Sequence, residues 1–176
     1  IGNTHSESST TGRAMTEAYH MAHKVIKNHV NAGADDVIIT AGFGMTAVVN
    51  KLQRMMGIRV PERSQDFSLG LPTRREEAVC DEDCPVVFVT HMEHHSNHIS
   101  WLETIADVIV IPPGANNVVE PNLLEAEVKK YSDRKLKIGA FTAASNVSGI
   151  LPDYRELARI MHHHGGLAFI DFAASA

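Results

Sequence analysis

Five short apolar segments alternate along the chain with segments typical of helices. The expected strands cover Asp36–Thr40, Pro85–Thr90, Asp107–Ile111, Lys137–Thr142 and Leu167–Asp171. This order favours parallel pairing, because a strand that rejoins a sheet in the same direction needs a crossover long enough for a helix. We therefore predict an α/β fold, a mostly parallel, doubly wound sheet with helices on both faces.

Caps and stop signals place the helices between these strands. We expect helices over residues 10–31, 47–56, 97–106, 121–131 and 153–164. Ser8, Ser9 and Thr10 suit the start of the first helix, and Gly33 suits a left-handed stop after it. Residues 58–83 show no clear periodicity, which predicts a long excursion with a functional or mobile role.

Length and composition limit the class of protein. A chain of 176 residues with 44% apolar and 21% charged residues supports one domain with a substantial core. The net charge of −5 gives no basic footprint for nucleic acid, and no apolar run is long enough for a membrane span. No signal-peptide pattern opens the chain, so we expect a cytoplasmic protein.

The two cysteines, Cys80 and Cys84, lie four residues apart. A zinc site needs more ligands than these two, so the sequence favours two unpaired thiols.

A glycine-containing turn is predicted between the first expected strand and the second helix. It holds Gly42, Gly44, Met45 and Thr46. Backbone N–H groups at a helix N-terminus attract anions, and the Thr46 hydroxyl adds a donor. The turn lacks the Lys-Ser/Thr pair of a P-loop, and a plain tight turn explains it as well as a phosphate cradle does.

Histidines gather in two places. The run from His91 to His98 directly follows the Pro85–Thr90 strand, where an imidazole is well placed to stack on a cofactor ring. A polar helix start and a metal site are the alternatives, and a metal site needs three or four convergent ligands. The run from His162 to His164 suits the C-terminal end of a helix.

Asp171 ends an apolar strand, and Asn146 follows another. A carboxylate at the end of a buried strand is costly unless a cation or a hydrogen-bond donor meets it. Ligands of open α/β sheets bind at this edge, so we expect Asp171 and Asn146 to reach one crevice.

In combination, these segments resemble the class V aminotransferase family, which includes cysteine desulfurases and selenocysteine lyases and uses pyridoxal phosphate (PLP). The matching segments are Gly44–Thr46 with Asn50, Glu93–Asn97 with Trp101, Ser145–Gly149, and Asp171 with Ala173. The resemblance covers nearly the whole chain. It implies the large domain of the PLP-transferase fold type I, incomplete over residues 1–176.

The resemblance also implies a role for each site residue. Gly44, Met45 and Thr46 would hold the cofactor phosphate. His94 would stack on the pyridine ring as the catalytic histidine, and Ala173 would pack on the opposite ring face. Asn146 would bond the phenolic oxygen. Asp171 would pair with the pyridine nitrogen and keep it cationic. No metal is implied.

The resemblance implies a PLP-dependent enzyme that acts on a small amino-acid substrate and forms a homodimer in its full-length form. In the family, the lysine that bonds PLP covalently lies beyond the position of Ala176, so we expect the isolated chain to be inactive. Ala174 stands where desulfurases usually carry glutamine. Two alternatives therefore stay open: transamination, epimerisation or another lyase reaction on the same fold, and a non-catalytic homologue.

Overall fold

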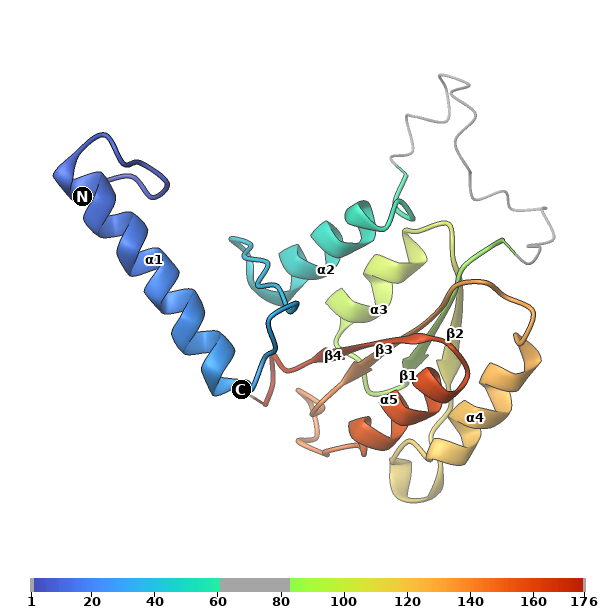
Figure 1. The fold of residues 1–176 in the computed structure, drawn as a ribbon. Helices are drawn as coiled ribbons and strands as arrows, with labels where there is room; N and C mark the ends of the chain where they lie inside the picture. The colour runs from blue at the N-terminus through green and yellow to red at the C-terminus, as the bar shows by residue number, and fades with distance from the viewer. Residues whose placement is uncertain (1, 61–82, 176) are drawn as a thin grey trace. The chain divides into compact units, whose positions relative to one another are not determined.

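The structure is a computed structural model that describes residues 2–60 and 83–175. The chain divides into two compact units, residues 1–40 and 41–176 (Figure 1). The expected excursion over residues 58–83, including Cys80, lies largely outside the described residues. Cys84 is disulfide-bonded, so the prediction of an unpaired thiol is wrong for this residue.

The first unit contains helix α1, Thr10–His29. Ser9 caps it as predicted, because its hydroxyl accepts a hydrogen bond from Gly12 N at 3.1 Å. The left-handed residue after the helix is Asn31, with φ 55°, and not Gly33. Asparagine tolerates this conformation better than most residues do.

The strand predicted over residues 36–40 does not form. A β-strand is stable only when a neighbouring strand takes up its backbone hydrogen bonds. The sheet orders its described strands β2-β1-β3-β4, and none of them pairs with this segment. Val37 is 78% exposed, so the segment also lacks the burial that stabilises short apolar strands.

The second unit holds a parallel sheet of four described strands, which confirms the predicted α/β class. They are β1 (Val86–Thr90), β2 (Asp107–Ile111), β3 (Lys137–Thr142) and β4 (Leu167–Asp171). Val86 pairs with Asp107 on one side and with Lys137 on the other, and Thr142 pairs with Asp171. Because all pairs are parallel, the carboxyl ends of the strands lie at one edge of the sheet.

Helices cover both faces of this sheet, as predicted (Figure 1). Their bounds are α2 (Gly44–Met55), α3 (His95–Leu102), α4 (Pro121–Lys130) and α5 (Tyr154–His163), and a 3₁₀ turn, η2, spans Ala115–Asn117. Helix α2 begins at Gly44, three residues before its predicted start at Ala47. Gly44, Met45 and Thr46 therefore belong to the helix and not to the turn before it. Helix α3 ends at Leu102, earlier than predicted.

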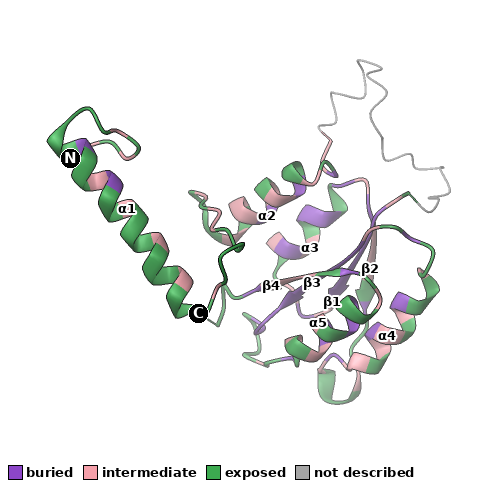
Figure 2. Cartoon of the chain, in the orientation of Figure 1, coloured by how far each residue is buried: buried purple, intermediate pink, exposed green. Residues whose placement is uncertain are grey.

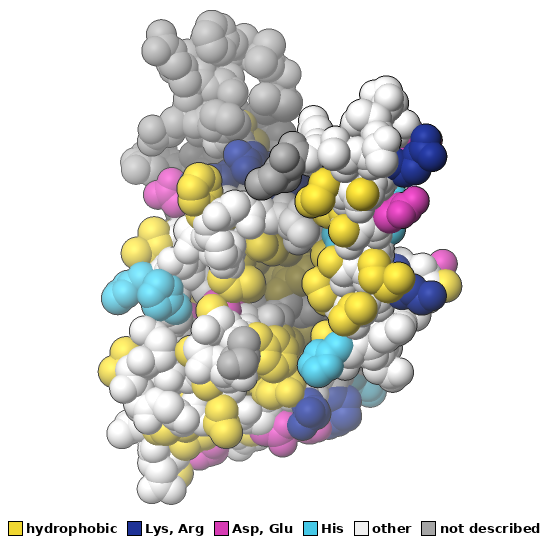
Figure 3. Space-filling model, turned by 90° about the vertical axis from the view of Figure 1, so that its left-hand side faces the viewer, with side chains coloured by type: hydrophobic (Ala, Val, Ile, Leu, Met, Phe, Trp, Pro, Cys, Tyr) yellow, Lys and Arg dark blue, Asp and Glu magenta, His cyan; other side chains and the backbone are white. Residues whose placement is uncertain are grey.

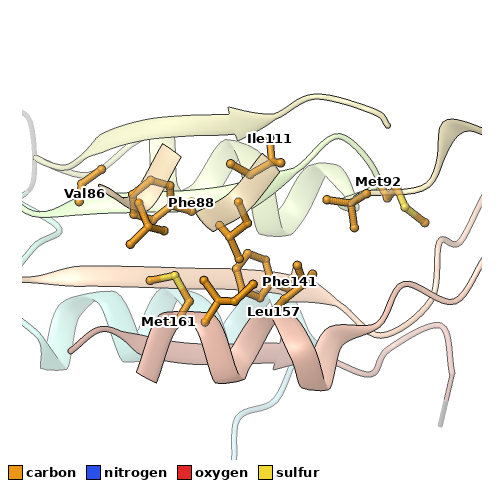
Figure 4. Close-up of a cluster of buried hydrophobic side chains, with 11 residues drawn as sticks. Val86, Phe88, Met92, Ile111, Phe141, Leu157 and Met161 are labelled. Atoms are coloured by element: carbon orange, nitrogen blue, oxygen red, sulfur yellow. The ribbon is translucent and has the colours of Figure 1, made fainter. Parts of the chain in front are cut away.

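Two apolar clusters fill the space between the sheet and its helices. Figure 4 shows the first, where Phe88 and Phe141 of the sheet meet Leu157 and Met161 of α5. The second lies on the other face, where Trp101 of α3 packs with β1 and β3 residues. The central strands β1 and β3 are buried along their whole length (Figure 2), which explains the apolar residues that make up most of each strand.

The surface carries charges of both signs. On the face drawn in Figure 3, acidic and basic side chains are scattered, with hydrophobic side chains between them. Among the described residues, no helix is both long enough and apolar enough to cross a membrane.

Candidate active site

A cavity of about 310 Å³ lies at the carboxyl ends of β3 and β4. The first turns of α2 and α3 contribute to its wall, together with the loops that follow β3 and β4. Its lining consists of Met45, Thr46, His94, Ser96, Thr142, Ala144, Asn146, Asp171, Ala173 and Ala174. This is the edge of an open α/β sheet where ligands bind.

Every predicted cofactor-binding residue except Gly44 lies in this lining. Gly44 is the first residue of α2 and directly precedes Met45. The chain thus brings together side chains that lie far apart in the sequence. Their roles toward a cofactor stay predictions.

Asp171 is the last residue of β4 and is only 7% exposed. Its Oδ1 accepts a hydrogen bond from Ala173 N at 2.9 Å, and its backbone oxygen accepts one from Ala143 N at 2.8 Å. Within the part of the chain that the structure describes, no lysine, arginine or histidine forms an ion pair with this carboxylate. A buried anion in this position suits a cationic ligand atom.

His94 is the N-cap of α3 and is exposed at the cavity. Its Nδ1 accepts a hydrogen bond from Ser96 N at 3.1 Å. In the neutral ring the proton therefore lies on Nε2, and the hydrogen bond limits rotation of the imidazole. The ring is held by its own helix in one orientation at the cavity wall.

Asn146 lies in the turn after β3, and this turn is internally bonded. The Ser145 hydroxyl accepts hydrogen bonds from Val147 N and Ser148 N, both at 3.3 Å. Ser145 N donates to Ile150 O at 2.9 Å, and Gly149 adopts φ 69°, which suits glycine. These contacts hold the backbone that carries Asn146 at the cavity.

Met45 and Thr46 lie in the first turn of α2, directly after Gly44, whose φ is 62°. The N-cap residue Phe43 makes no side-chain capping bond to this helix. Asn50 Nδ2 donates to Thr46 O at 2.8 Å, one turn further along. Free N–H groups and the Thr46 hydroxyl at a helix N-terminus can bind an anion.

Glu93 is a residue whose importance the sequence reasoning missed, since it had no role beyond membership of a motif. Its Oε1 accepts from Thr142 N at 2.9 Å and from Thr90 Oγ1 at 2.8 Å, and its Oε2 accepts from Asn97 Nδ2 at 2.8 Å. Burial raises the pKa of this carboxyl, and these donors partly oppose the shift. The signal that could have found it is a carboxylate three residues after the end of a buried strand, with an amide four residues later.

His91 and the run from His162 to His164 lie outside the cavity lining. His91 Nε2 lies 3.0 Å from Asn117 O, and His162 and His163 end α5 as predicted. His164 Nε2 lies 3.9 Å from Glu125 Oε1. Among the described residues, no group of three or more His, Cys, Asp or Glu side chains is arranged to hold a metal ion.

Comparison with known proteins finds cysteine desulfurases among the relatives of this chain. A probable cysteine desulfurase of Halalkalibacterium halodurans is 28% identical over 99% of this chain and 38% of its own length. A probable cysteine desulfurase of Methanothermobacter thermautotrophicus is 36% identical over 51% of this chain and 22% of its own length. The chain thus spans less than two fifths of these relatives.

Solved structures share the fold. The cysteine desulfurase CsdA of Escherichia coli superposes with a TM-score of 0.65 at 23% identity, over 98% of this chain and 38% of that one. The cysteine desulfurase of Thermococcus onnurineus gives 0.68 at 16% identity, over 96% and 36%. The family model described as Aminotransferase class-V matches residues 79–176, which contain β1 to β4 and most of the cavity lining. By this match the chain belongs to the class V aminotransferase family.

Proposed function

We propose that the full-length protein is a PLP-dependent enzyme that acts on an amino acid in the manner of cysteine desulfurases and selenocysteine lyases. The observation that carries this proposal is that Thr46, His94, Asn146 and Asp171 line one and the same cavity. The names of the relatives support the same reaction class.

The lining fits PLP on chemical grounds. The cofactor has a ring nitrogen that takes a proton, a phenolic oxygen and a phosphate. The cavity offers a buried carboxylate on Asp171, an amide on Asn146, and a helix N-terminus with a hydroxyl at Thr46. Its volume of about 310 Å³ lies within the range of small-molecule sites.

The chain's own residues would then have separate tasks. Asp171 would hold a proton on the ring nitrogen, because a carboxylate stabilises the cationic form of its neighbour. His94 would lie against the ring, in the orientation set by Ser96 N. Thr46 and the α2 N-terminus would bind the phosphate. When bound, PLP supplies an electron sink for a carbanion of the substrate.

One observation keeps other PLP chemistry open as a second candidate. Ala174 lines the cavity and has no polar side-chain group. Related desulfurases usually have glutamine at the position of Ala174, and its amide is a donor to the cofactor. In this chain a methyl group takes the place of that donor. Transamination, epimerisation or another lyase reaction is the alternative, and a non-catalytic homologue is the third possibility.

The full-length protein, purified with PLP, tests the proposal. We expect an absorbance band of enzyme-bound PLP, and turnover of cysteine or selenocysteine to alanine, with sulfide or selenide released when a thiol reductant is present. Turnover of other amino acids alone, with or without a 2-oxo acid acceptor, would favour the second candidate. PLP binding without turnover of any amino acid would favour the non-catalytic homologue.

The remaining parts of the proposal concern the whole protein. We propose that residues 1–176 form part of the large PLP domain. We also propose that the isolated chain is inactive, because none of its lysines matches the lysine that bonds PLP covalently in the family. We also propose a homodimer located in the cytoplasm. Light scattering of the full-length protein that shows only monomer would contradict the dimer.

A further inference from the structure

We propose that Glu93 is a positioning residue that holds the turn carrying His94 and the end of β3 at a fixed spacing, so that two walls of the cavity keep their relative position. The effect on the cofactor rests on the proposed function. The positioning itself does not, because it concerns contacts within the protein.

Glu93 connects three parts of the fold. It lies between β1 and α3, and its Oε1 accepts from Thr90 Oγ1 at the end of β1 and from Thr142 N at the end of β3. Its Oε2 accepts from Asn97 Nδ2 in the first turn of α3. One carboxylate therefore joins the ends of two strands to the start of the helix that His94 caps.

Both neighbours of this carboxylate reach the cavity. His94 follows Glu93 in the chain and lines the cavity. Thr142, whose N–H donates to Glu93, also lines the cavity and pairs with Asp171 in the sheet. Displacement of Glu93 would therefore move His94 relative to the strand pair that ends in Asp171. Among the described residues no basic side chain forms an ion pair with Glu93, so donors alone hold it.

The orientation of the Asn97 amide makes the arrangement specific for a carboxylate. Trp101 Nε1 donates to Asn97 Oδ1 at 3.1 Å, and the Trp101 side chain is fully buried. The amide group of Asn97 must therefore point its Nδ2 toward Glu93. A glutamine at position 93 would keep one acceptor for Thr142 N but would place an NH₂ group against Asn97 Nδ2.

This geometry allows a rescue experiment. E93Q puts two amide NH₂ groups face to face, and N97D puts two carboxylates face to face. In E93Q/N97D, the glutamine NH₂ donates to the aspartate, whose other oxygen still accepts from Trp101 Nε1. The double variant thus restores every hydrogen bond and moves the negative charge from position 93 to position 97.

The experiment uses the full-length protein, and its first readout is taken without PLP. With histidine ring nitrogens labelled, NMR reports the tautomer of His94, and hydrogen exchange reports the protection of the Thr142 amide. We expect both to change in E93Q and N97D and to return in E93Q/N97D. L157A is the control for general destabilisation, because Leu157 is fully buried in the cluster on the other face of the sheet. It should lower the melting temperature and leave the His94 signal in place.

The second readout is the dissociation constant of PLP. We expect each single variant to weaken PLP binding about tenfold or more, the effect of a buried group that loses its charged or polar partner, with recovery in the double variant. An unchanged His94 signal and Thr142 protection in E93Q, or a double variant no better than the singles, would overturn the positioning role. A wild-type protein that does not bind PLP would instead overturn the proposed function, and the PLP-free readouts would still decide on Glu93.

Discussion

Thr142 and Asp171 are register partners at the carboxyl ends of the parallel strands β3 and β4. Thr142 N donates to Glu93, and Asp171 O accepts from Ala143 N. The backbone of Asp171 is therefore held by its own strand pair, and its partner Thr142 is held in turn by Glu93 in the segment that precedes α3. Because the pairing sets the position of Asp171, substitutions of its side chain should leave the sheet intact and act on the ligand.

Asp171→Ala should impair activity of the full-length protein far more than it weakens PLP retention. In the proposed site, loss of the carboxylate would let the ring nitrogen lose its proton, while Thr46 and His94 would still hold the cofactor. We expect kcat to fall about 100-fold or more, as when other preorganised electrostatic groups are removed, and PLP occupancy to stay near that of wild type. Absorbance measures occupancy, and turnover with cysteine measures kcat. Asp133→Ala, at an exposed aspartate outside the cavity lining, is the control. Normal turnover of the Asp171 variant would exclude its assigned role.

His94 combines a capping bond with a ring at the cavity, and two substitutions separate these functions. His94→Ala removes both, so it should lower the free energy of unfolding by about 0.5–2 kcal/mol and weaken PLP binding. His94→Asn keeps a good N-cap, so stability should recover while PLP binding stays weak. His95→Ala, at the exposed neighbour, should change neither quantity. Urea unfolding and PLP titration measure the two effects, and equal PLP affinity in all three variants would contradict the ring contact.

The core beneath α5 should respond strongly to truncation. Leu157 is fully buried between α5 and the sheet, so Leu157→Ala should cost about 2–5 kcal/mol of unfolding free energy. Leu151 is 69% exposed, and Leu151→Ala should stay within about 0.5 kcal/mol of wild type. Denaturant unfolding compares the two. Similar losses of unfolding free energy in the two variants would mean that the buried cluster around Leu157 does not stabilise the protein as its burial predicts.

Three strands could be predicted from the sequence with their observed bounds: Asp107–Ile111, Lys137–Thr142 and Leu167–Asp171. Their apolar residues are enclosed by polar or turn-forming neighbours, and parallel sheets bury such segments. Residues 36–40 have a similar composition and form no strand, because pairing depends on a neighbour that local composition does not reveal.

The convergence of Thr46, His94, Asn146 and Asp171 followed from their places at strand ends and helix starts. Glu93 could not be assigned in the same way, because its function depends on Thr142 N, a backbone group from a strand that lies far along the chain. A sequence pattern shows side chains, and it does not show which backbone donors a fold brings to them.

Glu93 should also affect how stability depends on pH. Burial raises its pKa in the folded protein above the ordinary value of 4.5, so the folded state binds the proton more tightly than the unfolded state does. Protonation of Glu93 therefore stabilises the folded protein. This stabilisation is fully present below pH 4.5 and is lost as the pH rises through the raised pKa of the folded state. The stability advantage of wild type over E93Q should accordingly shrink as pH rises from 4 toward neutrality. Urea unfolding across that range measures it, and a difference independent of pH would contradict the raised pKa.

Gly42 and Gly44 give a matched pair for the turn before α2. An added Cβ would meet no atom within 4 Å at either position, but only Gly44 has a positive φ, 62°. Gly44→Ala should therefore cost about 1–2 kcal/mol through backbone strain alone, whereas Gly42→Ala should be neutral or slightly stabilising. Because Gly44 precedes Met45 and Thr46, its substitution should also weaken binding of PLP more than that of pyridoxal, which lacks the phosphate. Unfolding and titration with both ligands measure these effects. Equal losses for PLP and pyridoxal would show that this turn does not bind the phosphate.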